Sequence, residues 1–236
     1  MTMTDTASAL WFAAPVGFVE VPLDGTPEER LDRWSAAFDA IGSDIPQEQR
    51  IDTALNAEYL LQAQLLQGLV YLANCFYRTD EGEVIHAVFT ILVTPTETGG
   101  PLTFAARTAE QWAAARPGAE VGVLDLPCGR AAVATEDRLV TVPGKLYGLE
   151  QDSESLVRQI EVAIPHPAGR HVALVVLSTE YPEHWEHWAL AAGSALRELS
   201  FRDPLAVPPQ RQPIDRTGSV AVVTAGAEDR IRRAFG

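Results

Sequence analysis

The spacing of apolar side chains changes from about 3.6 residues to 2 near Gly68. Before Gly68, two stretches with helical spacing predict two helices, the first ending near Gly42 and the second at Gly68 itself. Thr26, followed by Pro27 and two glutamates, is typical of a helix start, because it supplies an N-cap and negative charge near the positive end of the helix dipole. The second helix collects five side chains on one face: Ile51, Leu55, Tyr59, Gln62 and Leu66.

After Gly68, alternating apolar and polar residues predict strands arranged in two hairpins. Residues 69–78 and 83–94 flank one turn, and residues 155–165 and 170–179 flank another. The remaining pattern predicts a helix over 101–116, short strands over 119–126, 130–135 and 138–142, and a long helix over 180–199. This order of elements indicates an α+β fold, in which helices pack on the faces of an antiparallel sheet.

The composition changes after residue 202. Residues 203–213 contain four prolines and predict an extended linker. The residues that follow predict a short basic helix with Ile231 and Phe235 on one side. We therefore expect a single α+β domain over residues 1–202, followed by a Pro-rich linker and a short amphipathic C-terminal tail over residues 203–236.

Charge and cysteine content exclude several classes of protein. The 236 residues include 18 basic and 32 acidic side chains, which gives a formal net charge of −14. Nucleic-acid binding needs clustered basic side chains, and anionic lipid surfaces repel an acidic protein. Two cysteines cannot form a disulfide-rich scaffold. We find neither a signal-peptide pattern nor an apolar run of membrane-spanning length, so we expect a cytoplasmic protein without membrane insertion. The scarcity of lysine beside arginine and alanine indicates a GC-rich gene of actinobacterial type.

Two histidines form the strongest metal-site candidate in the sequence. His184 and His187 lie three residues apart, on one face of a helix, with three glutamates nearby. The alternative is an ordinary first helical turn, in which Pro182 begins the helix and the glutamates complement its dipole. We favour the ordinary turn, and we expect neither a metal nor another cofactor.

Cys128 is the strongest nucleophile candidate, because His86, His166 or His171 could serve as its base. The alternative is a small buried side chain at a turn, between Pro127 and Gly129. The sequence contains neither a glycine-rich phosphate-binding pattern nor a nucleophile elbow. We therefore expect no catalytic residue, and we expect that the protein is not an enzyme.

Two short segments resemble the PsbP-like family, which includes the Ran-binding Mog proteins and bacterial relatives. Trp11-Phe12-Ala-Ala-Pro15-Val-Gly17-Phe18 is similar to the aromatic, proline and glycine opening of that family, and Leu199-Ser200-Phe201-Arg202 is similar to its close. The resemblance covers roughly residues 8–202. It implies an antiparallel α+β domain that binds other proteins as an assembly factor, a lipoprotein or a chaperone of secreted effectors. It carries over no catalytic residue.

These observations together favour a non-enzymatic accessory factor that binds a protein partner, which could be a second copy of the same chain. Such a factor could act as a chaperone or in association with a secretion system. The alternative is a small-molecule-binding domain or an enzyme with a pocket on the sheet face. Aromatic residues are enriched at binding surfaces as well as in cores. The candidate binding residues are Trp11, Phe18, Trp185, Trp188, Ile231 and Phe235.

Overall fold

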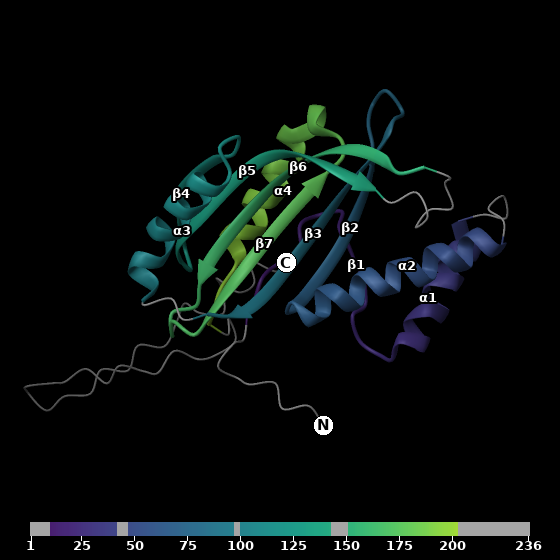
Figure 1. Ribbon diagram of the computed structural model, residues 1–236, viewed down its shortest axis with the longest axis horizontal. Coiled ribbons are helices and arrows are strands. Elements are labelled where there is room, and N and C mark those ends of the chain that lie inside the picture. Colours follow the sequence, from purple (N-terminus) through teal and green to yellow (C-terminus); the bar gives the residue numbers. More distant parts are fainter. Residues whose placement is uncertain (1–9, 42–46, 97–99, 143–150, 203–236) are drawn as a thin grey trace, which may run out of the picture. The chain divides into compact units, whose positions relative to one another are not determined.

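The computed structural model describes residues 10–41, 47–96, 100–142 and 151–202. Within these residues, seven strands form one antiparallel sheet in the order β1-β2-β3-β7-β6-β5-β4 (Figure 1). The strands are β1 (Val19–Glu20), β2 (Leu69–Arg78), β3 (Val84–Pro95), β4 (Glu120–Leu126), β5 (Gly129–Val142), β6 (Ser153–Pro165) and β7 (His171–Thr179).

The sheet joins two groups of strands that are each local in sequence. The hairpin β2–β3 forms one group, and the meander from β4 to β7 forms the other. The two groups meet where β3 pairs with β7, from Ala87 opposite Thr179 to Pro95 opposite His171. The centre of the sheet is therefore made by strands that lie far apart in the chain.

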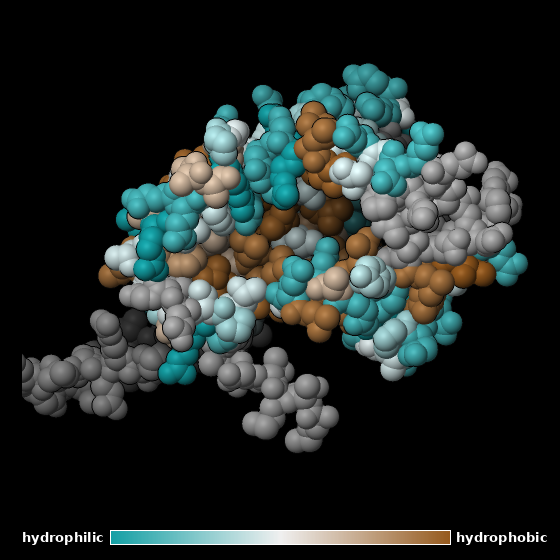
Figure 2. Space-filling view, in the orientation of Figure 1, coloured by the Kyte–Doolittle hydropathy of each residue, from teal (hydrophilic) through white to brown (hydrophobic). Residues whose placement is uncertain are grey.

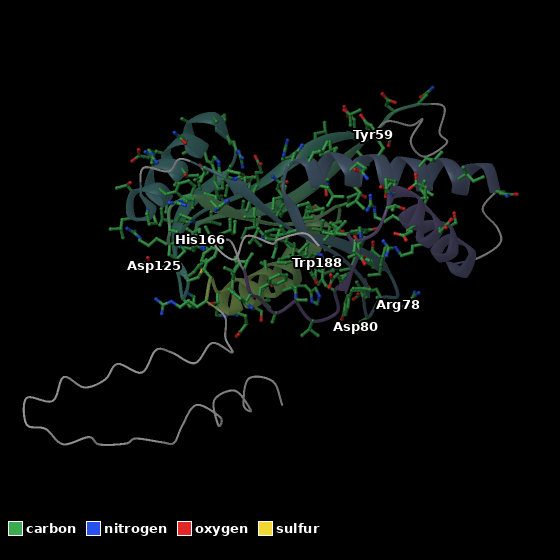
Figure 3. The ribbon with its side chains drawn as sticks, turned by 90° about the horizontal axis from the view of Figure 1, so that it is seen from below. Tyr59, Arg78, Asp80, Asp125, His166 and Trp188 are labelled. Atoms are coloured by element: carbon green, nitrogen blue, oxygen red, sulfur yellow. The ribbon has the colours of Figure 1, made fainter. Side chains whose placement is uncertain are left out.

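Helices cover both faces of this sheet. They are α1 (Pro27–Ile41), α2 (Gln47–Leu66), α3 (Pro101–Ala115) and α4 (Trp185–Glu198), with the 3-10 turn η3 (Pro182–His184) just before α4. Helix α3 contacts β4, β5 and β6, α2 contacts β2, and α1 packs on α2. Figure 3 shows α2 and α3 on one side of the sheet and α4 on the other. Among the described helices, none combines the length and the apolar character needed to cross a bilayer.

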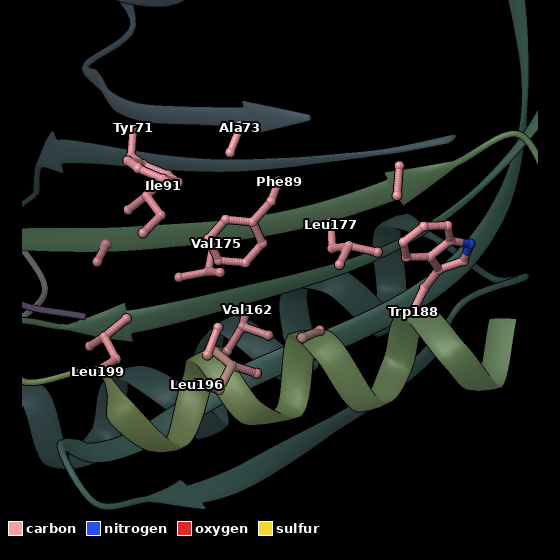
Figure 4. Packing of buried hydrophobic residues seen from close by; sticks show 14 of the residues in the cluster. Tyr71, Ala73, Phe89, Ile91, Val162, Val175, Leu177, Trp188, Leu196 and Leu199 are labelled. Atoms are coloured by element: carbon pink, nitrogen blue, oxygen red, sulfur yellow. The ribbon is translucent and has the colours of Figure 1, made fainter. Parts of the chain in front are cut away.

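The main hydrophobic core lies between α4 and the sheet. Its largest side chain, Trp188, is completely buried and packs beside strand residues such as Leu177 (Figure 4). Alternation along β3 turns Ile85, Ala87, Phe89 and Ile91 toward this core. Alanines on the two surfaces, including Ala173, Ala192 and Ala195, are members of the same cluster and let the helix approach the strands closely.

Helix α2 ends and β2 begins at Gly68, which has a positive φ of 93°. The Gly68 carbonyl accepts a hydrogen bond of 2.8 Å from the Val93 backbone N–H. A Cβ at position 68 would collide with the carbonyl oxygen of Val93. Only glycine satisfies both the backbone angle and this close approach, so Gly68 fixes α2 beside the β2–β3 hairpin.

The fold confirms the expected α+β class, with an antiparallel sheet and helices packed on its faces. It corrects one strand prediction. The two strands expected over 130–135 and 138–142 are a single strand, β5, because Glu136 and Asp137 are held in register across β6. Gln159 donates to Glu136 over 2.9 Å, and Arg158 donates to Asp137 over 2.6 Å. Polar residues therefore continue the strand instead of interrupting it.

Two helix faces also differ from a simple reading of the apolar pattern. On α3, the apolar Leu102 is 83% exposed, whereas the polar Thr108 is buried. On α2, the face marked by Ile51, Leu55, Tyr59 and Leu66 is exposed. The adjacent face, with Ala54, Glu58 and Leu61, is the buried one.

Candidate functional site

The face of the sheet between α3 and α2 carries a half-buried group of side chains, which we term the open face. In the orientation of Figure 2, this side shows a hollow with a hydrophobic floor. Eight residues of β2, β3 and β7 that point to this side are neither fully buried nor fully exposed. They are Leu72, Asn74, Val88, Thr90, Leu92, Leu174, Val176 and Ser178.

Strand register places these side chains in rows across the sheet. Leu72 lies opposite Thr90, and Thr90 lies opposite Val176. In the next row, Val88 lies between Asn74 and Ser178. A solvent-exposed sheet face normally carries polar residues at the alternate strand positions that point toward it. Here Val88, Leu92, Leu174 and Val176 are apolar, so the centre of the open face has the composition of a surface that is covered in use.

Helix α3 covers one side of this face and then ends. Its Phe104, Ala109 and Trp112 pack against a second, smaller core cluster. That cluster contains the strand residues Ala132, Ala163 and Val172, with Leu174 packed at its border. Val176 lies on β7 two residues beyond Leu174 and is only half-buried, so Leu174 marks the edge of the surface that α3 covers.

A charged group lies beside the open face at the C-terminal end of α3. Arg116 Nη1 binds Glu161 Oε2 at 2.7 Å and Glu136 Oε1 at 3.5 Å, and its guanidinium stacks over the ring of Trp112. Gln159 Nε2 donates to the same Glu136 oxygen over 2.9 Å. Arg138 Nε lies 4.0 Å from the same Glu136 oxygen, so two guanidinium groups balance the two carboxylates at this polar edge.

His86 forms the corresponding polar edge on the β2–β3 side. Its Nε2 lies 3.2 Å from Asn74 Oδ1, and its ring stacks on Phe76 with centroids 4.5 Å apart. Burial lowers the pKa of His86, and the negative charge of Glu180 opposes this effect only in part. The imidazole is therefore biased toward its neutral form, while the ring of Phe76 remains 71% exposed.

The candidate aromatic residues within the described part of the chain lie on the other side of the sheet or at its margin. Phe18 packs edge-on against Phe89 and Trp188, with ring centroids 6.0 and 6.1 Å away. Trp188 is fully buried in the core, so it cannot contact a partner without unfolding. Trp11 forms two backbone hydrogen bonds with Ser200, of 2.8 and 2.7 Å. The two segments that carry the PsbP-like resemblance are thus directly paired.

Trp185 lies beside a polar cleft of roughly 270 Å³ on the α4 side. The guanidinium of Arg158 lies 5.7 Å from the Trp185 ring centroid and donates to both oxygens of Asp137, over 2.6 and 2.9 Å. Because this cation is already paired within the chain, the cleft offers a weaker case for ligand binding than the open face.

The histidine pair of α4 contacts the β2–β3 hairpin. His184 Nε2 lies 3.5 Å from Glu83 Oε2, and the ring of His187 stacks on Tyr77 with centroids 4.7 Å apart. Among the described residues, no three His, Cys, Asp or Glu side chains gather as a metal-binding group would require. The two histidines serve here to seat the start of α4 on the hairpin.

Cys128 lies in the β4–β5 turn and packs against the main core cluster. Burial raises the pKa of its thiol, which is the opposite of what a nucleophile needs. His86 belongs to the other face of the sheet, whereas His166 packs against Phe201 with ring centroids 4.8 Å apart. Cys128 therefore lacks the lowered thiol pKa that a nucleophilic cysteine requires.

The remaining candidates, Ile231 and Phe235, lie outside the described residues, as does the linker over 203–213. A pocket on the sheet face was one of the alternatives from the sequence, but none of the residues of the open face was among the candidate binding residues. The sequence contained a signal for this face, because β3 and β7 carry apolar residues at most positions on both sides. Each strand taken alone is nevertheless typical of an ordinary buried strand.

Comparison with protein-family models, curated proteins and solved structures gives no significant match to this chain. The conclusions about its role therefore rest on the geometry and chemistry of the open face.

Proposed function

We propose that the protein is a non-enzymatic binding protein that holds an amphipathic helix of a partner protein on the open face. One observation carries this proposal: Val88, Leu92 and Val176 form an apolar surface at the centre of the sheet that is only half-buried. Covering apolar surface is favourable by about 25 cal/mol per Å² removed from water. A partner that completes this layer would gain that energy without reshaping the sheet.

The dimensions of the face fit a single helix. Helix α3 covers β4, β5 and β6, and α2 contacts β2, so β3 and β7 separate the two helices. Neighbouring strands lie about 4.8 Å apart, so the span from β2 to β6 is about 14 Å. An α-helix with its side chains is about 10–12 Å wide. A partner helix would therefore lie between α2 and α3 as a further member of the same layer.

The charges of the protein favour a partner helix with basic flanks. The chain as a whole carries a formal charge of −14. Complementary charge accelerates association and selects among partners. The binding energy itself would come from the apolar floor, and the PsbP-like resemblance supports such an accessory role in the cytoplasm.

The proposal is tested by placing a charge on the floor of the open face. Tagged wild-type protein and its Val176→Glu and Leu190→Glu variants are used to capture partners from the native cell, followed by mass spectrometry. Leu190 is an exposed residue of α4 on the opposite side of the sheet, which makes it a matched control. We expect a partner that wild-type and Leu190→Glu retain and that Val176→Glu loses, with all three proteins melting at similar temperatures.

A photo-crosslinking residue at Thr90 should then join the same partner and identify the bound peptide. A partner retained equally by all three proteins would overturn the assignment of the open face. Recovery of a small apolar molecule instead of a protein, detected by native mass spectrometry of wild-type but not Val176→Glu, would show that the face is a ligand pocket.

A further inference from the structure

Helix α2 exposes a continuous apolar surface that the open face does not include. This α2 stripe consists of Ile51, Leu55, Tyr59 and Leu66, which are 48%, 50%, 71% and 89% exposed. Figure 3 shows Tyr59 on the outer side of α2, away from the sheet. Solvated helices normally present polar residues on that side, so the α2 stripe needs its own explanation.

The stripe is rigidly presented, because the neighbouring side of α2 is firmly held. Ala54 and Leu61 are buried there, and Glu58 forms a buried ion pair of 2.6 Å with Arg30 of α1. Helix α2 therefore cannot rotate to bury the α2 stripe without breaking that pair and exposing Leu61. Together the stripe residues expose on the order of 500 Å², which is the size of the largest patch on a typical monomer, and such patches are often functional.

The spacing of the stripe is compatible with two-fold symmetry. An antiparallel copy of α2, related by an axis that passes between Glu58 and Tyr59, would place Ile51 opposite Leu66 and Leu55 opposite Gln62. At each end of the stripe, Ile51 of one copy then contacts Leu66 of the other. The two Tyr59 rings lie close together near the axis. Isologous interfaces are self-complementary in this way, and antiparallel helices also oppose their dipoles favourably.

The area agrees with this symmetric partner. Two stripes would bury about 1,000 Å² in total, which is near the lower limit for a specific and reversible interface. Among the described side chains, local charge does not oppose the contact, because Gln62 within the stripe is neutral and the neighbouring Glu58 is paired with Arg30. The net charge of −14 acts only over longer distances, where dissolved salt screens it.

We propose that the α2 stripe is the interface of a reversible homodimer, in which two α2 helices pack antiparallel about an axis at Tyr59. This inference is independent of the partner assigned to the open face. The dimer should form in the micromolar range of protein concentration. It should become tighter as salt rises, because salt screens the repulsion between two acidic chains but leaves the apolar contact intact.

Sedimentation velocity of the full chain tests the inference, with proteins compared at about 0.1 M and 1 M NaCl, where the screening length falls from about 10 Å to 3 Å. We expect a concentration-dependent dimer for wild-type, Leu190→Glu and Val176→Glu. Tyr59→Glu and Leu55→Glu should weaken dimerisation by at least about tenfold, a change equivalent to 1.4 kcal/mol. Circular dichroism should show unchanged folding, because both side chains are exposed in the monomer.

A short bismaleimide reagent then tests the orientation. Tyr59→Cys should give a covalent dimer, because the two thiols lie near the axis. Leu66→Cys should not, because two antiparallel copies of that position are separated by about 22 Å along the helices. Wild-type protein controls for its two own thiols, of which Cys75 is buried and Cys128 is half-buried.

A wild-type chain that stays monomeric at high concentration in 1 M NaCl would overturn the inference, as would a Tyr59→Glu variant that dimerises like wild-type. Self-association that weakens as salt rises would show an electrostatic contact instead of an apolar one, and it would also overturn the inference. If Tyr59→Glu abolishes the dimer while the partner of the open face is still captured, the two surfaces are separate.

Discussion

At the scale of single residues, the strongest polar interaction is the buried pair Arg30–Glu58. Both Glu58 oxygens accept from Arg30 within 3.1 Å, and Arg30 Nη1 also donates to the Gly25 carbonyl over 2.7 Å. The hydrogen bonds from Arg30 hold the pKa of Glu58 below its usual range, against the effect of burial. The pair thereby fixes α1, α2 and the segment before α1 to one another.

Removing one member of this pair should be costly. Glu58→Ala leaves the Arg30 guanidinium buried without its partner, so we expect a loss of about 2–3 kcal/mol in the free energy of unfolding. Urea unfolding provides the measurement. The double variant Arg30→Met/Glu58→Met, which leaves no unpaired charge, should recover most of this loss. A double variant as unstable as Glu58→Ala would contradict this account.

His86 makes stability depend on pH in a defined direction. Its pKa is lowered in the folded state, so the unfolded chain binds the proton first as pH falls below about 6.5. The contribution of His86 to stability therefore decreases on acidification from about pH 6.5 down to its lowered folded pKa. Below that value this contribution no longer changes. We expect His86→Gln, which keeps a polar neighbour for Asn74, to show a smaller loss between pH 7.5 and 5.5 in urea unfolding. Equal losses in the two proteins would exclude His86 as the source.

At the scale of elements, two glycines provide a matched test of the α2–β2 junction. Gly68 and Gly82 have almost the same positive φ, 93° and 87°. A Cβ at Gly82 would meet nothing within 4 Å, whereas at Gly68 it would strike Val93. We expect Gly82→Ala to cost about 1 kcal/mol, from the backbone angle alone. Gly68→Ala should cost at least about 2 kcal/mol more, because β3 must move. Similar melting temperatures for the two variants would contradict the close approach.

The elements themselves were largely predictable, because each has a clear period and clear boundaries. The two hairpins and the helices follow from Gly68, Gly82 and Pro101, which interrupt or begin regular patterns. The buried face of α2 could not be predicted in the same way. This helix is apolar on two sides, and Glu58 lies on the buried side only because Arg30 comes to meet it from α1. That contact depends on tertiary structure, which the period of one helix does not contain.

At the scale of the whole molecule, the open face has the same origin. In the sequence, Val88 and Val176 are ordinary strand residues. They become part of one surface only because β3 pairs with β7, which places Val88 beside Ser178 and Thr90 beside Val176. Strands β3 and β7 are neighbours in the sheet, but β4, β5 and β6 lie between them in the sequence. No local sequence pattern therefore predicts their pairing. Burial by α3 then stops at Leu174, and this boundary depends on the length and position of one helix.

The distribution of the core predicts where the chain can be shortened. Both hydrophobic clusters and all seven described strands lie before residue 203. A chain ending at residue 202 should therefore unfold in one cooperative transition with its Trp188 core intact, as measured by urea titration of tryptophan fluorescence. A broad, non-cooperative transition would show that residues 203–236 are required for the fold, against the domain boundary expected from the sequence.

The pairing of β3 with β7 also means that β3 is synthesised well before its partner strand. Ribosomes add about 5–20 residues per second, so the roughly 75 residues between Pro95 and His171 take about 4–15 s to appear. Throughout that interval, the backbone groups of β3 that will bond to β7 have no partner strand. The nascent first half of this protein thus presents an unpaired apolar strand edge for seconds, and it is the species on which chaperones or aggregation would act.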